Sequence, residues 1–512
     1  MSQEKTSWWT AAGQRGELLK NMQIDLLNIL LVSTLVIALP LIQWMRGSGL
    51  RDMNPTENRV IKNWLIFITA IIFLRAVVGT IFIVGGISHW SIQKFYPIRI
   101  AYPNYGILGG LPYVVIGFII LAYLRSICHF ISSNRSRYVL FWAFSVALSI
   151  TFGGIHGGII TGNIGVSGAL DHIHDASLNR TIAETFSTHT DRITGHLEPG
   201  YKAPHTLSHP AGSLAYWQFM THATSPIVFS LINVFILSLA FTVMYWALRR
   251  HYPDKDASQV IIGCMVTPAI LIYGRSDEAV YYAFAAVIMA LSHISIMERR
   301  YILTLGIGVL LAVAINISYA ALIMVPALLT FTTNERLNKL WTHIRLVTPH
   351  ALIIAVVVIF MTSVTRKYLG YSYLDAFLAS VDHNSGSNIV HMLGNGYYWV
   401  ILNDRIMTIC DFLLFGGPLF LYLFYRLCKG ADWKIVGWRI RNIALSVLML
   451  VLIVNSNGPG EVSRPWGSIY LVVGIIWFAE LLKHEEESTR WWIIRSQLLW
   501  GLTLQTILNF GW

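Results

Sequence analysis

Long apolar runs alternate with short polar breaks along most of the chain, from about residue 24 to residue 510. Many of these runs approach the roughly 20 apolar residues that a helix needs to cross the hydrocarbon core of a membrane. The pattern predicts spanning helices near residues 24–46, 61–86, 107–124, 138–161, 225–248, 258–274, 279–297, 347–365, 406–425, 440–456 and 466–483. We therefore expect an all-α, polytopic transmembrane helix bundle of about 11 to 14 spans with one long polar loop.

Some apolar stretches do not fit a single crossing. Basic segments flank residues 301–332 on both sides, which predicts a helical hairpin or a re-entrant pair broken around Asn316. The run from Trp491 to Phe510 either crosses the membrane or lies along its surface. Arg75 lies in the middle of its run, so it either faces a partner inside the bundle or marks a run that is not one simple span.

Composition places the chain among integral membrane proteins. Hydrophobic residues make up 55% of its 512 residues and charged residues only 12%, compared with about 25% charged residues in soluble domains. We expect a multi-pass protein of a plasma, inner or ER membrane, in contact with membrane lipids. The four cysteines lie in or beside apolar runs without metal-ligand spacing, which is typical of buried thiols: Cys128, Cys264, Cys410 and Cys428.

The positive charge of the chain is explained by topology. The formal net charge is +11, and most lysines and arginines lie in connections between apolar runs: Arg125, Arg135 and Arg137; Arg249, Arg250 and Lys255; Arg299 and Arg300; Arg336, Lys339 and Arg345; and Arg426, Lys429, Lys434, Arg439 and Arg441. Such basic connections favour the cytoplasmic side. We therefore expect no nucleic-acid partner, and we expect the polar loop 162–225 on the extracytoplasmic side.

Four polar segments share that predicted outer face. The histidine-rich loop 162–225 ends in His209-Pro210-Ala211-Gly212, and Gly274-Arg275-Ser276-Asp277-Glu278 forms a tight connection between two runs. Residues 366–405 form a second long loop, and residues 457–466 enter a late run. Carboxylates, imidazoles and guanidinium groups therefore converge on one side of an apolar scaffold.

Three of these segments carry a family resemblance. His209-Pro210-Ala211-Gly212 resembles the His-Pro-Pro-Gly motif of a branch of the GT-C membrane glycosyltransferases, with alanine in place of the second proline. Thr267 to Tyr281 is similar to that branch's span ending in a polar turn, and Gly460-Glu461-Val462-Ser463-Arg464-Pro465-Trp466 resembles its late Gly-Glu-x-x-Arg-x-Trp segment. The order and spacing agree from about residue 138 to residue 480.

The resemblance implies an enzyme that moves a sugar from a polyprenyl-phosphate donor to a lipid, glycan or protein acceptor on the extracytoplasmic face, with inversion. It also implies a division of the chain into an N-terminal membrane region of unclear role (1–137), a GT-C-like catalytic core (138–484) and a C-terminal membrane helix (485–512). Transfer of this kind needs a base for the acceptor hydroxyl and cationic or hydrogen-bonding groups for the departing phosphate.

Acidic residues in the outer loop are the candidate bases. The family's base is usually an acid in the loop after an early core span, a place that Asp171 and Asp175 occupy here. Either of them fits, and Asp191 is a third candidate. The alternative is that the acidic and histidine cluster only caps a surface helix.

The remaining candidates are His209, as a catalytic residue, and groups that would bind the donor phosphate. Arg464 offers a bidentate fork to phosphate oxygens, with Glu461 to orient it, although an internal ion pair would leave the same pattern. His209 either bonds donor or acceptor, or only shapes the entry to the next helix. Further candidates are Arg275 with Asp277 and Glu278, unless that turn is simply solvated, and Lys202 and His205.

No cofactor is required by these patterns. Asp171, His172, His174 and Asp175 contain plausible ligands for a divalent metal, but no Cys pair or His-Glu-x-x-His motif accompanies them. The rival class is a secondary transporter or channel, in which Arg75, the break near Asn316 and the histidines form a substrate path.

Overall fold

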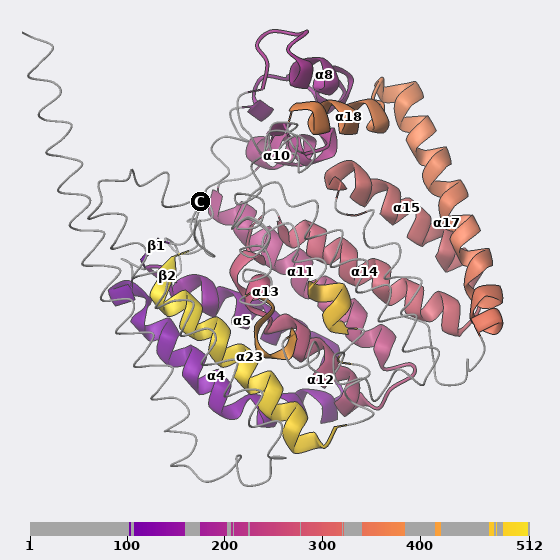
Figure 1. The fold of residues 1–512 in the computed structure, drawn as a ribbon. Helices are drawn as coiled ribbons and strands as arrows, with labels where there is room; N and C mark the ends of the chain where they lie inside the picture. Colours follow the sequence, from indigo (N-terminus) through magenta and orange to yellow (C-terminus); the bar gives the residue numbers. More distant parts are fainter. Residues whose placement is uncertain are drawn as a thin grey trace, which may run out of the picture.

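The computed structural model describes residues 102–103, 107–158, 175–201, 206–207, 209–223, 226–276, 278–319, 321, 340–383, 415–420, 470–475, 478 and 485–509. Regular structure in this part of the chain is helical apart from one antiparallel pairing, between β1 (Tyr102–Pro103) and β2 (Leu508–Asn509). Figure 1 shows the helices side by side in one bundle, with α8 (Ile182–Thr194), α10 (Ala211–Ala223) and α18 (Tyr373–His383) at one end.

Five helices are long and apolar enough to cross a membrane: α4 (Ile107–Ser133), α5 (Arg137–Gly154), α11 (Pro226–Leu248), α14 (Glu278–Met297) and α17 (Leu340–Leu369). The prediction of a helical membrane protein is confirmed to this extent. The predicted spans at 24–46, 61–86 and 440–456 lie outside the described residues, as do most of 406–425 and 466–483.

A proline divides one predicted span into two helices. Residues 258–274 were expected as one run, but α12 (Asp254–Met265) ends before Thr267 and α13 (Pro268–Tyr273) begins at the proline. Pro268 has no N–H to donate to the preceding turn, and its ring clashes with the carbonyl four residues earlier. Proline suits the first position of a helix for the same reasons, so a new helix starts there.

Helix α15 (Tyr301–Ile317) ends at the predicted break. Its C-cap, Ser318, has an extended backbone with φ −147° and ψ 127°. The stretch 301–317 is therefore a single helix that packs on α14, α17 and α10. The choice between a helical hairpin and a re-entrant pair depends on residues 322–339, which are outside the described part.

The C-terminal helix α23 (Glu487–Ile507) lies lengthwise along α4 (Figure 1). Its first residue bonds Arg125 near the end of α4, and the strand after its last turn pairs with the strand before α4. The two helices are therefore antiparallel. Helix α23 is not among the five helices long and apolar enough to span a membrane, so the choice between a crossing and a surface placement stays a prediction.

Helix α14 lies at the centre of the packing. It contacts α11, α13, α15 and α17, and residues such as Tyr282, Ala286 and Met289 are fully enclosed. The outer helices expose apolar side chains instead, for example Val356, Ile359 and Phe360 on α17, each more than 60% exposed. An apolar face of this kind is what a lipid-facing helix presents.

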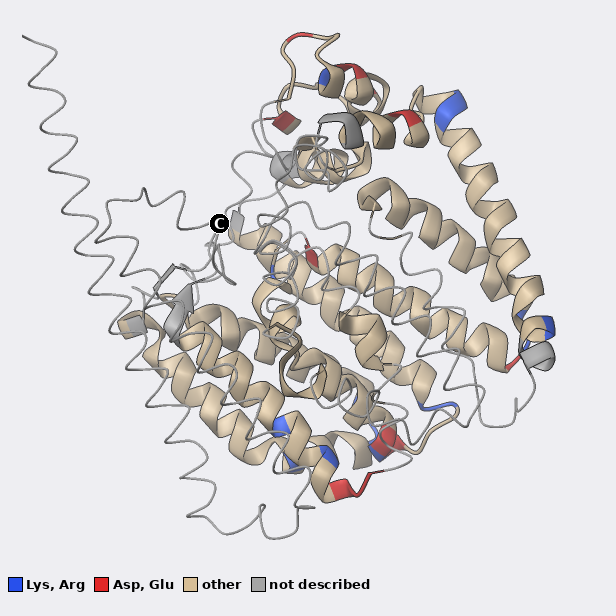
Figure 2. Ribbon diagram, viewed as in Figure 1, with Lys and Arg blue, Asp and Glu red and all other residues tan. Residues whose placement is uncertain are grey.

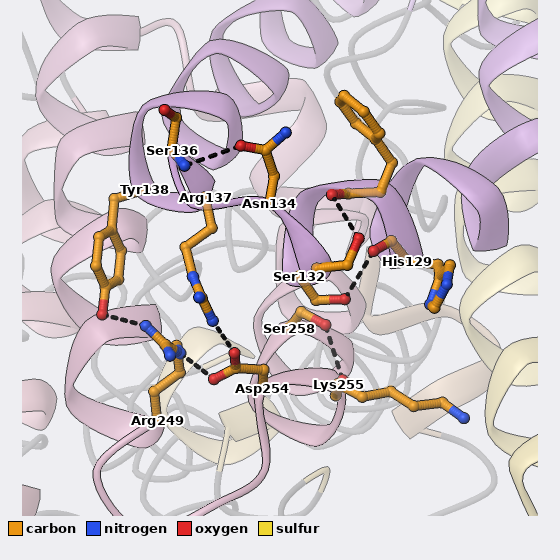
Figure 3. A network of polar contacts seen from close by, with 12 residues as sticks. His129, Ser132, Asn134, Ser136, Arg137, Tyr138, Arg249, Asp254, Lys255 and Ser258 are labelled. Atoms are coloured by element: carbon orange, nitrogen blue, oxygen red, sulfur yellow. Dashed lines mark hydrogen bonds and ion pairs between the residues drawn. The ribbon is translucent and has the colours of Figure 1, made fainter.

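Ion pairs gather at one end of the bundle, which we call the ionic end (Figure 2). Asp254 accepts bonds from both Arg137 and Arg249, and Arg249 also bonds Tyr138 (Figure 3). Glu298 pairs with Arg250 and Arg300, Glu487 with Arg125 and Lys255, and Asp256 with Arg490. The basic connections around residues 125–137, 249–255 and 298–300 therefore share one end, as their charge predicted.

Candidate functional site

The opposite end of the bundle carries a cap made of α8 (Ile182–Thr194), α10 (Ala211–Ala223) and α18 (Tyr373–His383). Thr181 and Glu184 start α8: the Thr181 side chain accepts the Glu184 N–H, and the Glu184 carboxylate accepts the Arg180 N–H. Such reciprocal bonds satisfy backbone donors that a helix start leaves open. Gly195, with φ 74°, ends the helix in the left-handed conformation that glycine adopts most easily.

Apolar and polar contacts join α8 to α10. Trp217 stacks on Phe229 with ring centroids 4.6 Å apart, in a cluster with Ile193, Leu207 and Leu214. Beside it, Thr185 Oγ1 donates to Gln218 Oε1 at 2.8 Å, and Gln218 Nε2 donates to the Asn179 carbonyl at 2.7 Å. The loop 162–225 therefore includes a packed structure of its own.

The segment His209–Gly212 lies where the cap meets the bundle. His189 of α8 donates from Nε2 to the His209 carbonyl at 3.0 Å, and the Ala211 N–H donates to the Tyr371 hydroxyl at 3.5 Å. Pro210, Ala211 and Gly212 are buried, whereas His209 keeps part of its surface exposed. The histidine is therefore the accessible residue of a segment that is otherwise enclosed.

Gly212 allows this segment to lie against the end of α15. A Cβ atom placed on Gly212 would come within 2.4 Å of the Asn316 carbonyl oxygen. No side chain fits there without moving the backbone of one helix, so glycine is needed for close approach rather than for an unusual backbone angle. The predicted break at Asn316 thus forms part of the floor under the cap.

Helix α14 meets the same segment from the side. The His209 ring stacks on the Tyr281 ring with centroids 6.4 Å apart, and Ser213 Oγ shares a hydrogen bond with the Tyr281 hydroxyl at 3.1 Å. Tyr281 belongs to the second sequence segment with a family resemblance. Two of the three segments are therefore in direct contact, although 68 positions separate the bonded residues.

The tight connection between α13 and α14 is enclosed by protein. Arg275 is 3% exposed and Glu278 is 2% exposed, so the alternative of a solvated turn is wrong for these two residues. The Ser276 hydroxyl donates to the Glu278 carboxylate and accepts the Glu278 N–H at 3.3 Å. A carboxylate at this place also interacts favourably with the positive end of the helix dipole.

Arg275 is tied to its surroundings through its backbone and its guanidinium. Its carbonyl accepts Asn233 Nδ2 at 3.5 Å, Asn233 in turn accepts the Tyr216 hydroxyl of α10, and Arg275 Nη2 donates to the Ile272 carbonyl at 3.4 Å. Burial lowers the pKa of Arg275 to about 10, so the side chain stays positively charged at neutral pH. The buried cation Arg275 is thus linked to α10 through the Asn233 side chain.

Burial also sets the protonation states inside the cap. Desolvation lowers the pKa of His189 to about 4, so the ring is neutral at physiological pH. The bond to the His209 carbonyl places its proton on Nε2, because a carbonyl oxygen only accepts. Desolvation raises the pKa of Tyr371 to about 12, so its hydroxyl keeps its proton.

The candidate bases lie in different environments. Asp175 is fully enclosed. Desolvation is the largest cause that raises the pKa of Tyr201, and the nearby Asp175 adds a smaller effect in the same direction. Asp191 is exposed on α8. The base role of either residue stays a prediction.

Several predicted site residues fall outside the described part of the chain: Asp171, Lys202, His205, Asp277, Glu461 and Arg464. The same is true of His172 and His174, the histidines of the possible metal site. Within the described ranges no group of three or more His, Cys, Asp or Glu side chains is arranged to hold a metal ion.

The sequence did not single out His189, Ser213, Tyr371 or Asn233 as site residues. Histidines are frequent in the loop 162–225, and nothing in its local pattern separates His189 from the others. Tyr371 follows α17 and reaches the His209 segment from 160 positions away.

No protein family, curated protein or solved structure matches this chain.

Proposed function

We propose that this protein is a membrane glycosyltransferase, which moves a sugar from a polyprenyl-phosphate donor to a lipid, glycan or protein acceptor at the cap end of the bundle. The observation that supports it best is the contact between His209-Pro210-Ala211-Gly212 and the segment ending in Tyr281. These two segments resemble motifs of one enzyme branch, and their meeting at one end of an apolar bundle is what a shared site requires.

The surroundings of His209 suit a phosphorylated lipid. The partly exposed imidazole stacks on Tyr281, whose hydroxyl bonds Ser213, and the buried Arg275 lies in the connection just before α14, the helix that carries Tyr281. Hydrogen-bond donors and a fixed positive charge in a site that excludes water stabilise a departing phosphate. The polyprenyl tail would then lie against the apolar faces of the neighbouring helices.

The finer features of the proposal follow from the same resemblance. We assign a GT-C-like core to residues 138–484, with the cap on the extracytoplasmic side and the ionic end in the cytoplasm. In this assignment Asp171 or Asp175 takes the acceptor proton, and Arg464, oriented by Glu461, holds the donor phosphate with Lys202 and His205 nearby. Arg275 is a further candidate for holding the donor phosphate, and Asp277 and Glu278 are further site candidates.

The test is a transfer assay on purified full-length protein in lipid nanodiscs. The donors are dolichyl- and undecaprenyl-phosphate hexoses and pentoses labelled in the sugar, and both transfer and donor hydrolysis are measured. We expect turnover of at least one donor. We also expect His209→Ala to lower kcat/KM by about 10- to 100-fold, as the loss of a hydrogen bond to a charged group does.

Matched variants separate the roles of the other residues. Asp171→Asn or Asp175→Asn should abolish transfer in a folded protein, and Arg464→Ala should weaken donor use more than acceptor use. Asp375→Asn, an exposed carboxylate on α18, is the control. Absence of turnover with every donor, together with uptake of a solute into sealed vesicles, would instead identify a transporter.

A further inference from the structure

His189 occupies an unusual position for a histidine of a polar loop. Its side chain is fully buried on α8, between the rings of Tyr201 and Tyr371, whose centroids lie 5.4 Å and 6.0 Å from its own. Among the described residues, its only polar contact is the 3.0 Å bond from Nε2 to the His209 carbonyl. A buried imidazole with this single bond is directed at one place in the chain, the backbone of the histidine in the proposed site.

Tyr371 reaches the same segment from the other side of the cap. The chain reverses after α17 at Gly370, with φ 66°, and this turn brings Tyr371 against Phe186 and His189. Its ring forms edge contacts with both, at 5.4 Å and 6.0 Å, and its hydroxyl accepts the Ala211 N–H at 3.5 Å. Two residues from distant parts of the sequence therefore bond the backbone of the His209 segment, one at residue 209 and the other at residue 211.

We propose that His189 and Tyr371 are positioning residues, which fix the backbone of the His209–Gly212 segment so that the His209 imidazole stays stacked on Tyr281. The effect of this positioning on sugar transfer rests on the proposed function. The contacts of His189 and Tyr371 with the segment are independent of that function. The His209 carbonyl is bonded on one side and Gly212 is pressed on Asn316 on the other, so the backbone that carries the imidazole is held at both ends.

A chemical probe of His209 tests this directly. Diethyl pyrocarbonate acylates neutral accessible imidazoles, and peptide mass spectrometry gives the rate for each histidine in the intact protein. The variants are His189→Phe, which fills the space without a donor, His189→Gln, which can keep a donor near the place of Nε2, and Tyr371→Phe, which removes only the hydroxyl. His196→Phe, an exposed histidine just beyond α8, is the control.

Release of the segment should expose His209. We expect its acylation rate to rise about fivefold in His189→Phe and in Tyr371→Phe, a factor that the loss of one hydrogen bond allows. His189→Gln and His196→Phe should stay within about twofold of the parent protein, as neutral substitutions do. Tyr371→Phe keeps the aromatic contacts, so it remains informative if His189→Phe does not fold.

Unchanged reactivity of His209 in folded Tyr371→Phe and His189→Phe protein would overturn the proposal. The probe needs no sugar donor, so its result is independent of whether any donor is turned over. In the transfer assay the same two variants should lower kcat with little change in donor KM, and His189→Gln should restore it. Failure of transfer in the parent protein together with the expected acylation pattern would reject the enzyme function and keep the positioning role.

Discussion

Gly212 of α10 rests on the carbonyl oxygen of Asn316 at the end of α15, with no room between them for even a methyl group. The contact joins the cap to the bundle at the segment that carries His209. Because both partners are backbone, neither can move aside by a change of rotamer. This relationship makes the cap position sensitive to the smallest possible substitution.

Gly212→Ala should destabilise the protein by about 1–3 kcal/mol, the usual cost of forcing an extra carbon into a packed interior. The measurement is thermal unfolding in nanodiscs, followed by tryptophan fluorescence. Gly306→Ala in α15 is the matched control, because an added Cβ there meets nothing within 4 Å. This control should be neutral or stabilising by up to about 1 kcal/mol, since alanine favours helix. Equal stability of the two variants would contradict the close contact.

The buried His189 makes stability depend on pH. Its pKa of about 4 in the folded protein is below the usual 6.5, so the unfolded chain binds a proton more readily. The contribution of the neutral, buried His189 ring to the free energy of unfolding is fully present above pH 6.5. It is lost as the pH falls toward 4, by roughly 3 kcal/mol in total. Chemical unfolding of the parent protein and of His189→Gln across this range should show the difference, with the variant lacking this component. Parallel curves for the two proteins would be evidence that the pKa of His189 is the same in the folded and unfolded states, as for an exposed imidazole.

Arg299 adopts a left-handed backbone with φ 54° in the short turn between α14 and α15. A residue with a Cβ atom pays a steric cost of about 1–2 kcal/mol in this region. Arg299→Gly should therefore stabilise the protein by about 0.5–1 kcal/mol, after allowance for the greater freedom of glycine in the unfolded chain. Arg299→Ala removes the charge but keeps the strain, so its melting temperature should not rise. A gain in both variants would indicate a charge effect instead.

Asp254 is the shared acceptor of Arg137 and Arg249 at the ionic end. Asp254→Asn leaves the two guanidinium groups facing each other and should lower stability by about 1 kcal/mol. Added salt should shrink the difference, because these side chains are partly exposed and their interactions are screened. Asp375→Asn on α18 provides a carboxylate control at the cap, where melting should not change. A difference that is independent of salt would point to packing rather than charge.

The spans with clear signals at both ends were predictable from sequence. Helices α11 and α14 begin and end within a residue or two of the predicted runs 225–248 and 279–297. Each has a polar or proline-containing start and a basic connection after its end. The apolar run between these two signals gives the extent of the helix. Hydropathy could not divide the predicted run 258–274, because residues 260–266 and 268–273 are both apolar and only Pro268 marks the break.

The candidate site was predictable only in its local pieces. The His209 segment and the Tyr281 segment were recognised separately, and the basic connections correctly indicated a shared end. Burial of Arg275 and Glu278 was not predictable from a short polar turn, because the bond to the connection comes from Asn233 of α11, which Tyr216 of α10 bonds in turn. His189 and Tyr371 depend in the same way on contacts between distant segments, which a local pattern does not record.

The packing of α23 along α4 also makes more distant segments depend on this helix. Gln497 of α23 accepts the Leu419 N–H at 3.0 Å, and Gln505 bonds His156 at 3.2 Å. Both partners lie far from α23 in the sequence. Removal of residues 487–507 would therefore take these two hydrogen bonds away from groups inside the packed helices, where an unmade bond is costly.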